Sequence, residues 1–358
     1  EAKAIEPENP IIIVVEGVLQ SYIEVWFQNV TLRHKVTLYR DGIDKFALDI
    51  SNTINITKQR DYELVMNIAT GIESRRTFYT DSNGFQMMRR KKMDIPIQGN
   101  FYPVASSAFI EDSHLRMTIL AAQPGGGASL RSGELEIMQD RTNSYDDGHG
   151  IGQGGTDNLE TVSKFKVMFE VPNQKVDPDA VPLLSLPAHH QIHNLLHPVP
   201  AFVETSAASP GASYNFTRYS PSIQNYFLPC DVGLVLSHPL PRYKDTERPQ
   251  DTTTFVHVGD KVGLIFNRVG YDKRFSIEPL RSTCSCGNMG TLNVHKLFGN
   301  MYESKLQRTG LSFVQELEEI DGTQDFFMKP MDMYGFTVKF KKIGVNEWDH
   351  AIRLNATS

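Results

Sequence analysis

The stretch TVSKFKVMFEV, residues 161–171, decides the fold class of this chain. Phenylalanine and valine occupy every second position from Phe165 to Val171, with lysine, methionine and glutamate between them. A period of two places alternate side chains on opposite faces of an extended chain, so this stretch predicts a half-buried β-strand. The same alternation recurs in residues 23–27, 134–137 and 336–341. We therefore predict an all-β protein.

Turn signals and prolines divide the predicted strands into two domains. Triplets such as Arg40-Asp41-Gly42 and Ser82-Asn83-Gly84 are typical of the turns between short strands of a β-sandwich. Twelve of the 19 prolines lie between Pro172 and Pro249 and mark the change from one unit to the next. We predict a large antiparallel, supersandwich-like β-sandwich, a Pro/Ser/His-rich connector, a smaller β-sandwich domain and a tail, at residues 1–172, 173–224, 225–343 and 344–358.

Charge and hydropathy narrow the class of partner. The net charge of -6 and the pI near 6.0 argue against nucleic acid as the main partner, and the basic run 89–92 is interpreted as a solvated strand end. The longest apolar run, residues 11–15, is too short to span a membrane and predicts a fully buried strand. The chain begins at Glu1 without a signal sequence, which we interpret as a processed chain or a fragment of a longer one.

Sequons and cysteines are compatible with the secretory lumen. Four N-x-S/T sequons are glycosylation candidates, at Asn29, Asn55, Asn215 and Asn355. The three cysteines are Cys230, Cys284 and Cys286, and the single residue between the last two is a poor spacing for a zinc or redox motif. One disulfide bond from Cys230 to either of the other two, or no disulfide bond, are the alternatives.

A glycine-rich loop at residues 146–155, DDGHGIGQGG, is the first candidate site. Its five glycines let a ligand approach the main chain, which favours a binding rim, although an ordinary surface loop has the same composition. The loop contains the dinucleotide fingerprint G-x-G-x-x-G, but a predicted strand and not a helix follows it, which argues against a Rossmann site. Asp146 and Asp147 suggest the carboxylate pair of a glycosidase, but adjacent carboxylates are more typical of a turn.

A histidine cluster in PAHHQIHNLLHP, residues 187–198, is the second candidate. Spacings of four residues place His189, His193 and His197 on one face of a short helix, where they could bind a metal ion. The flanking prolines and the absence of neighbouring Asp, Glu or Cys favour an exposed connector instead. No self-contained catalytic motif is present, so we assign no catalytic residue to this chain.

Four successive motifs resemble glycoside hydrolase family 38, the α-mannosidases. They are FYTDSNGFQMMRRKK at 78–92, QGNFYPVASSAFIED at 98–112, QPGGGASLRSGELEIMQDR at 123–141 and DDGHGIGQGGTDN at 146–158. LPCDVGL at 228–234 and the region 311–336 are similar to the closing β domain of the family. The resemblance is to the C-terminal β region, and to the Golgi branch more than to the lysosomal one.

The family resemblance implies a retaining exo-α-mannosidase that trims mannose from N-glycans in the Golgi lumen. It implies an aspartate nucleophile, a second aspartate as general acid/base, and a zinc ion held by His and Asp ligands. The resemblance places all of these in an N-terminal catalytic domain outside this chain. We therefore expect the 358-residue chain to be inactive by itself. The alternative function is a non-enzymatic carbohydrate-binding or scaffolding β protein from a truncated gene.

The resemblance also implies a role for the glycine-rich loop in holding the terminal mannose. The substrate-binding candidates are Asp146, Asp147, His149 and Gly150. The family usually has Arg where this chain has His149, and a second Arg where it has Thr142. A contact made through the main chain survives that change, whereas a guanidinium contact does not, because histidine is shorter and mostly neutral at pH 7.

Overall fold

A computed structural model describes residues 3–6, 9–27, 31–146, 148, 150, 152–174, 180–200, 226–241, 258–298, 303 and 305–339. By their internal contacts the residues form two units, one comprising residues 1–204 with 270–280 and the other residues 205–269 with 281–358. The domain boundaries drawn from the sequence remain a prediction.

The described residues of the first unit form thirteen strands. They are β1 (Ile11–Val15), β2 (Gln20–Phe27), β3 (Leu32–Tyr39), β4 (Leu48–Ile54), β5 (Tyr62–Ala69), β6 (Thr77–Ser82), β7 (Gln86–Lys91), β8 (Tyr102–Val104), β9 (Ser107–Glu111), β10 (Arg116–Ala121), β11 (Gly125–Ala128), β12 (Glu134–Thr142) and β13 (Thr161–Glu170). Its helix α1 spans Leu186–Leu196, and short 3₁₀ turns lie at Ile43–Phe46, Ile97–Asn100 and Glu278–Leu280.

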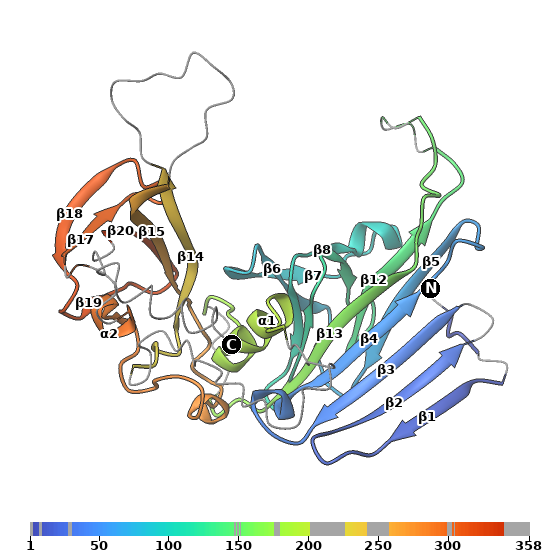
Figure 1. Ribbon diagram of the computed structural model, residues 1–358. Coiled ribbons are helices and arrows are strands. Elements are labelled where there is room, and N and C mark those ends of the chain that lie inside the picture. Colours follow the sequence, from blue (N-terminus) through green and yellow to red (C-terminus); the bar gives the residue numbers. More distant parts are fainter. Residues whose placement is uncertain are drawn as a thin grey trace, which may run out of the picture. The chain divides into compact units, whose positions relative to one another are not determined.

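These strands form two antiparallel sheets. Nine are ordered β1-β2-β3-β4-β13-β10-β9-β6-β7, and four are ordered β5-β12-β11-β8. Figure 1 shows β1 to β4 and β13 side by side in the larger sheet, with α1 beside it. The core between the sheets includes Phe165 and Val167 of β13 and Leu135 and Ile137 of β12, as their period of two predicts. The prediction of an all-β fold that begins with a large antiparallel sandwich is confirmed.

The apolar run at residues 11–15 does not form the fully buried strand that we predicted. It is β1, the edge of the nine-stranded sheet, where Ile12 is 60% exposed and Val14 is 62% exposed. The buried residues of the core between the two sheets belong, on the larger sheet, to β4, β13, β10, β9 and β6. The smaller sheet has only four strands, so it faces the middle of the larger one and leaves β1 uncovered among the described residues.

The expectation of an exposed connector is also wrong for the histidine-rich segment. Residues 186–196 form α1, which begins at the N-cap Ser185, whose hydroxyl oxygen accepts a hydrogen bond from the Ala188 amide at 3.1 Å. The helix packs with Leu120 and Met168 on the face of the larger sheet that points away from the sandwich core. Met168 is an apolar residue at one of the positions of β13 that alternate with the core positions. It is apolar because it packs against α1 on this second face of the sheet.

The second unit contains a smaller set of antiparallel strands. β14 (Val232–Pro241), β15 (Val258–Arg268), β20 (Asp332–Lys339), β17 (Lys305–Thr309) and β18 (Glu316–Asp321) form a sheet in that order. β16 (Thr291–Leu292) pairs with β19 (Phe326–Phe327), and the short helix α2 spans Val294–Phe298. The core of this unit includes Leu264, Phe266 and Phe336.

Candidate functional site

The glycine-rich loop connects the two sheets of the first unit. β12 of the four-stranded sheet leads into it, and β13 of the nine-stranded sheet follows it. Figure 1 shows both strands running to the end of the sandwich from which this connection projects. The element after the glycines is thus a strand, as the sequence predicts, and not the helix that a dinucleotide site requires.

A short stem closes the loop. The Asn143 amide donates to the Gly155 carbonyl oxygen at 2.9 Å, and the two residues form an isolated β-bridge. Next to them, Thr142 is buried and its hydroxyl donates to the same carbonyl oxygen at 3.5 Å. The side chain at position 142 therefore belongs to the stem and presents no group to solvent.

Side-chain hydrogen bonds hold both legs of the stem, one to the distant Asp61 and one between the two legs. On one leg, the Ser144 amide and hydroxyl each donate to Asp61 Oδ1 at 2.7 Å, and these bonds lower the pKa of the Asp61 carboxyl. On the other leg, Asn158 Nδ2 donates to Asp140 Oδ1 and to the Arg141 carbonyl oxygen, each at 2.8 Å. The loop is thus held at its base.

The glycines of the loop serve two different needs. A Cβ at Gly154 would lie 2.3 Å from the Asn143 carbonyl oxygen, so only glycine fits beside the stem. Gly148, Gly150 and Gly152 have positive φ angles of 76°, 131° and 71°, and a Cβ on any of them would meet no atom within 4 Å. Backbone conformation and not crowding favours glycine at these three positions, and it leaves the main chain open to an approaching ligand.

The four predicted substrate-binding residues divide into two pairs. Asp146 and Gly150 lie exposed on the loop, whereas Asp147 and His149 lie outside the described residues. Their roles therefore remain predictions. Tyr145, which is not among the predicted residues, is 61% exposed at the start of the loop. The signal for it is an aromatic residue directly before the acidic pair, because an aromatic ring can pack on the apolar face of a sugar and its hydroxyl can bond the polar one.

The histidine cluster is not assembled as a metal site. His189 is buried and its Nε2 donates to the Gly270 carbonyl oxygen at 3.0 Å, and burial lowers the pKa of its ring to about 4. Burial also lowers the pKa of His193. No group of three or more His, Cys, Asp or Glu side chains able to hold a metal ion occurs among the described residues. We therefore derive no step through zinc with the described side chains.

The remaining candidates concern the secretory pathway. Cys230 and Cys284 form a disulfide bond, and Cys286 is a free thiol. Among the sequons, Asn55 is partly exposed and its Oδ1 accepts a hydrogen bond from the Thr57 hydroxyl at 2.6 Å, while Asn29, Asn215 and Asn355 lie outside the described residues. None of the helices in the described part of the chain is long and apolar enough to cross a membrane.

Comparison with known proteins decides the family. Residues 1–149 match the family described as the C-terminal domain of glycosyl hydrolases family 38. α-Mannosidase 2 of Mus musculus is 30% identical over 93% of this chain, and that of Drosophila melanogaster is 32% identical over 90% of it. The chain belongs to glycosyl hydrolase family 38. Its similarity is to α-mannosidase 2 and to the C-terminal domain of the family, as the four sequence motifs indicate.

Two further facts bound what family 38 membership means here. The chain spans only 28% of the length of the mouse relative and 26% of the fruit fly relative. The crystal structure of an α-mannosidase from Enterococcus faecalis V583 matches 93% of this chain and 35% of its own, with a TM-score of 0.52 and 11% identity. At 11% identity this structural match supports the fold of the chain but says nothing about its sugar-binding residues.

Proposed function

We propose that this chain is the C-terminal β portion of an α-mannosidase that removes α-linked mannose from N-glycans with retention of configuration. In this proposal the loop 146–155 completes the sugar-binding rim of a catalytic domain that the rest of the protein carries. The observation that carries the proposal is the identity of about 30% with α-mannosidase 2 over nearly the whole chain, loop included. The nucleophile, the acid/base group and zinc would belong to the catalytic domain, and the protein would act in the Golgi lumen.

The chemistry proposed for the loop is binding and orientation. Glycines with positive φ leave main-chain N–H and C=O groups accessible, and sugar hydroxyls can both donate to and accept from such groups. The acidic pair Asp146 and Asp147 would accept hydrogen bonds from sugar hydroxyls, and Tyr145 would pack against the ring. His149 would hold the terminal mannose through its main chain, since its side chain lacks the reach and charge of arginine.

Zinc would enter this function only through the other domain. When bound there, it would grip hydroxyls of the terminal sugar and help to orient the scissile bond. The residues of this chain would help to bind and orient the sugar. For that reason we expect the 358-residue chain by itself to release no mannose from an aryl α-mannoside.

The test is to purify the full-length gene product that contains this chain and to assay mannose release from an aryl α-mannoside with and without a chelator. We expect chelator-sensitive activity in the full-length protein and none in residues 1–358. Replacement of His149 by Arg in the full-length protein should leave kcat/KM equal or raise it. Robust turnover by the isolated chain, or a full-length protein without mannosidase activity, would contradict the proposal.

The rim itself needs a separate measurement. In the full-length protein, Tyr145→Ala and Asp146→Asn should raise KM for the mannoside, because they remove contacts to the bound sugar. Lys45→Gln, at an exposed position of the 3₁₀ turn before β4, is the matched control, because it lies at the other end of β4 from the residue that pairs with the start of β13. If the loop variants and the control have the same KM, the loop does not belong to the sugar site.

A further inference from the structure

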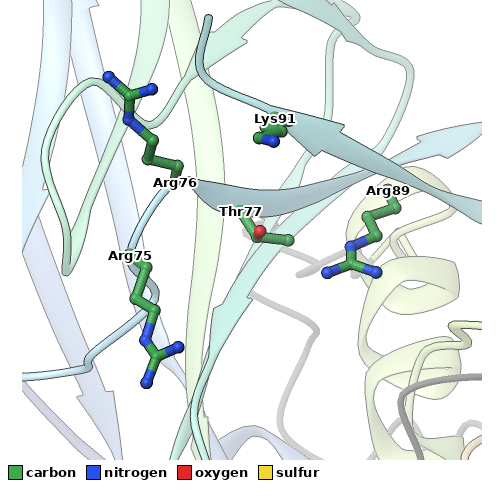
Figure 2. A pocket seen from close by; sticks show the side chains of 5 residues that line it. All are labelled: Arg75, Arg76, Thr77, Arg89 and Lys91. Carbon is green, nitrogen blue, oxygen red and sulfur yellow. The ribbon is translucent and has the colours of Figure 1, made fainter.

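A second candidate site lies on the β6–β7 hairpin, away from the glycine-rich loop. Arg75, Arg76, Thr77, Arg89 and Lys91 line a cavity of about 650 Å³. Figure 2 shows the Thr77 side chain in the middle of this group, with the four cationic side chains around it. We call these five residues the basic pocket.

Strand pairing places three of the five residues of the basic pocket on one face of the sheet. Thr77 of β6 lies opposite Lys91 of β7, and Tyr79 lies opposite Arg89. Opposed residues and residues two apart share a face, so Lys91 and Arg89 stand beside each other next to Thr77. β7 is the edge strand of the nine-stranded sheet, so no other described strand pairs with its outer side.

The turn before β6 supplies the other two cations. Arg75 has a φ of 56°, which is a left-handed backbone conformation. This conformation is unfavourable in free energy for any residue other than glycine. Two hydrogen bonds to the turn before β12 hold it there, from the Arg75 amide to Ser132 Oγ at 2.9 Å and from the Gly133 amide to Ser74 Oγ at 3.0 Å. Distant segments thus bring Arg75 to the hairpin, and the run of residues 89–92 alone does not make the pocket.

The positive charge of the basic pocket is mostly uncompensated. Arg76 forms a hydrogen-bonded ion pair with Asp94, with Nη1 to Oδ2 at 3.1 Å, and this pairing raises the pKa of Arg76. Arg75, Arg89 and Lys91 form no ion pair with any described acidic residue. In a chain with a net charge of -6, three unpaired cations around one cavity are a local reversal of sign.

We propose that the basic pocket binds an extended, multiply charged anionic glycan, a sulfated or phosphorylated oligosaccharide. Guanidinium groups recognise sulfate and phosphate oxygens through paired N–H donors, and the Thr77 hydroxyl adds a neutral one. The cavity is large enough for a small organic ligand and much larger than one oxyanion. In Figure 2 the side chains of Arg75 and Arg76 point in opposite directions, which fits charges spread along a chain better than a single anion.

Protection of the sheet edge is the competing explanation for these charges. Lysine and arginine on an edge strand discourage pairing with another chain. That role requires charges on β7 itself, at Arg89 and Lys91, and it does not require Arg75, which lies before β6. It also does not explain why hydrogen bonds hold Arg75 in a strained conformation beside the same cavity. Arg75 therefore separates the two explanations.

The experiment is calorimetric titration of the 358-residue chain with a heparin hexasaccharide, with the same saccharide after desulfation, and with inorganic sulfate. We expect the sulfated hexasaccharide to bind, its affinity to fall as salt is added, and the other two to bind at least about tenfold more weakly. Arg75→Gln and Arg89→Gln should each weaken binding by about fivefold to tenfold, whereas Arg89→Lys should recover much of the loss. Lys58→Gln, an exposed cation outside the pocket, should change the affinity by less than about twofold.

Each remaining outcome has a defined meaning. Circular dichroism and thermal melting identify a variant that has lost its fold, and Arg75→Gly, which suits the left-handed conformation, then replaces Arg75→Gln. Aggregation of the Arg89 variant with unchanged saccharide binding would assign the charges to edge protection and overturn the proposal. Equal binding of inorganic sulfate, or tighter binding of a single-stranded oligonucleotide of equal charge, would overturn the assignment to a sulfated glycan. The mannosidase assay plays no part, so this result is independent of the proposed function.

Discussion

The glycine pair at the end of the rim loop allows a sharp test of how the loop is held. An alanine at position 154 would place its Cβ 2.3 Å from the Asn143 carbonyl oxygen and 2.8 Å from the Ser144 carbonyl carbon. At position 155 the added Cβ would meet no atom within 4 Å, and neither glycine has a positive φ. The two substitutions are chemically identical and adjacent, but only one of them collides with the stem.

The size of the effect follows from the geometry. Ordinary contact begins at 3.4 Å, so the two legs must separate by about 1 Å to accept Gly154→Ala. The 2.9 Å bond from the Asn143 amide to the Gly155 carbonyl oxygen would then exceed hydrogen-bonding distance. Loss of one hydrogen bond and the strain of overpacking together cost about 2 kcal/mol, which corresponds to roughly thirtyfold in the opening equilibrium of the stem.

Amide hydrogen exchange measures this opening directly. We expect the Asn143 amide to exchange roughly thirtyfold faster in Gly154→Ala than in the parent chain, and Gly155→Ala to differ by less than about threefold. Amides of β10, such as that of Ile119, lie in the core and serve as an internal reference. Equal protection of Asn143 in both variants would refute the stem as described, and faster exchange at Ile119 would mean that the whole sandwich had been destabilised.

Three further predictions concern stability. Arg116 is buried against Glu111 at 2.7 Å and Asp272 at 2.9 Å, so Arg116→Met should lower the free energy of unfolding by about 4 kcal/mol in urea denaturation, and a loss below about 1 kcal/mol would contradict the pairing. Burial lowers the pKa of His189 from 6.5 to about 4 in the folded protein, so protonation below pH 6.5 favours the unfolded chain. The free energy of unfolding should therefore fall by about 3 kcal/mol between pH 6.5 and pH 4, and urea titrations of His189→Gln should show a smaller fall over that range. The disulfide bond between Cys230 and Cys284 closes a segment of 54 residues, so Cys230→Ser should lower the free energy of unfolding of the second unit by about 4 kcal/mol, measurable by scanning calorimetry.

Periodicity correctly identified four strands, β2, β12, β13 and β20, but not the place of a strand in its sheet. The alternating run from Phe165 to Val171 correctly predicted β13, although only Phe165 and Val167 lie in the core, whereas Phe169 is 46% exposed and Val171 is 67% exposed. The uniformly apolar run at residues 11–15 predicted a buried strand, yet β1 is an exposed edge. Burial of a strand depends on how many strands the facing sheet contains, and no local pattern in the sequence carries that number.

Helix α1 is the opposite case, a segment that the local sequence predicts to be exposed and that is largely buried in the structure. Local composition favoured a connector, since prolines flank the histidines and the segment is rich in polar residues. In the structure, residues 270–280 return to the first unit and place the Gly270 carbonyl oxygen against His189. The partner that makes burial of this imidazole possible is 81 residues away, so only the folded chain reveals it.

The candidate sites were visible in the sequence to unequal degrees. Glycine composition indicated a loop at residues 146–155 but left an ordinary turn as the simpler interpretation, and the family motifs supplied the sugar-binding role. The basic run at residues 89–92 was correctly predicted to be an exposed strand end. The cavity also requires Arg75 and Arg76, and the bond from the Arg75 amide to the distant Ser132 is not visible in the sequence.

One strand pair explains how both candidate sites are positioned. β5 and β12 pair antiparallel from Tyr62 opposite Thr142 to Ala69 opposite Glu134. At the first end Asp61 anchors the glycine-rich loop through Ser144, and just beyond the second end Ser132 anchors Arg75 of the basic pocket. Eight residues of strand separate the two ends by about 25 Å. Because neither anchor shares a contact with the other, the stem and the pocket should respond to substitution independently, and one rigid ladder is enough to hold both.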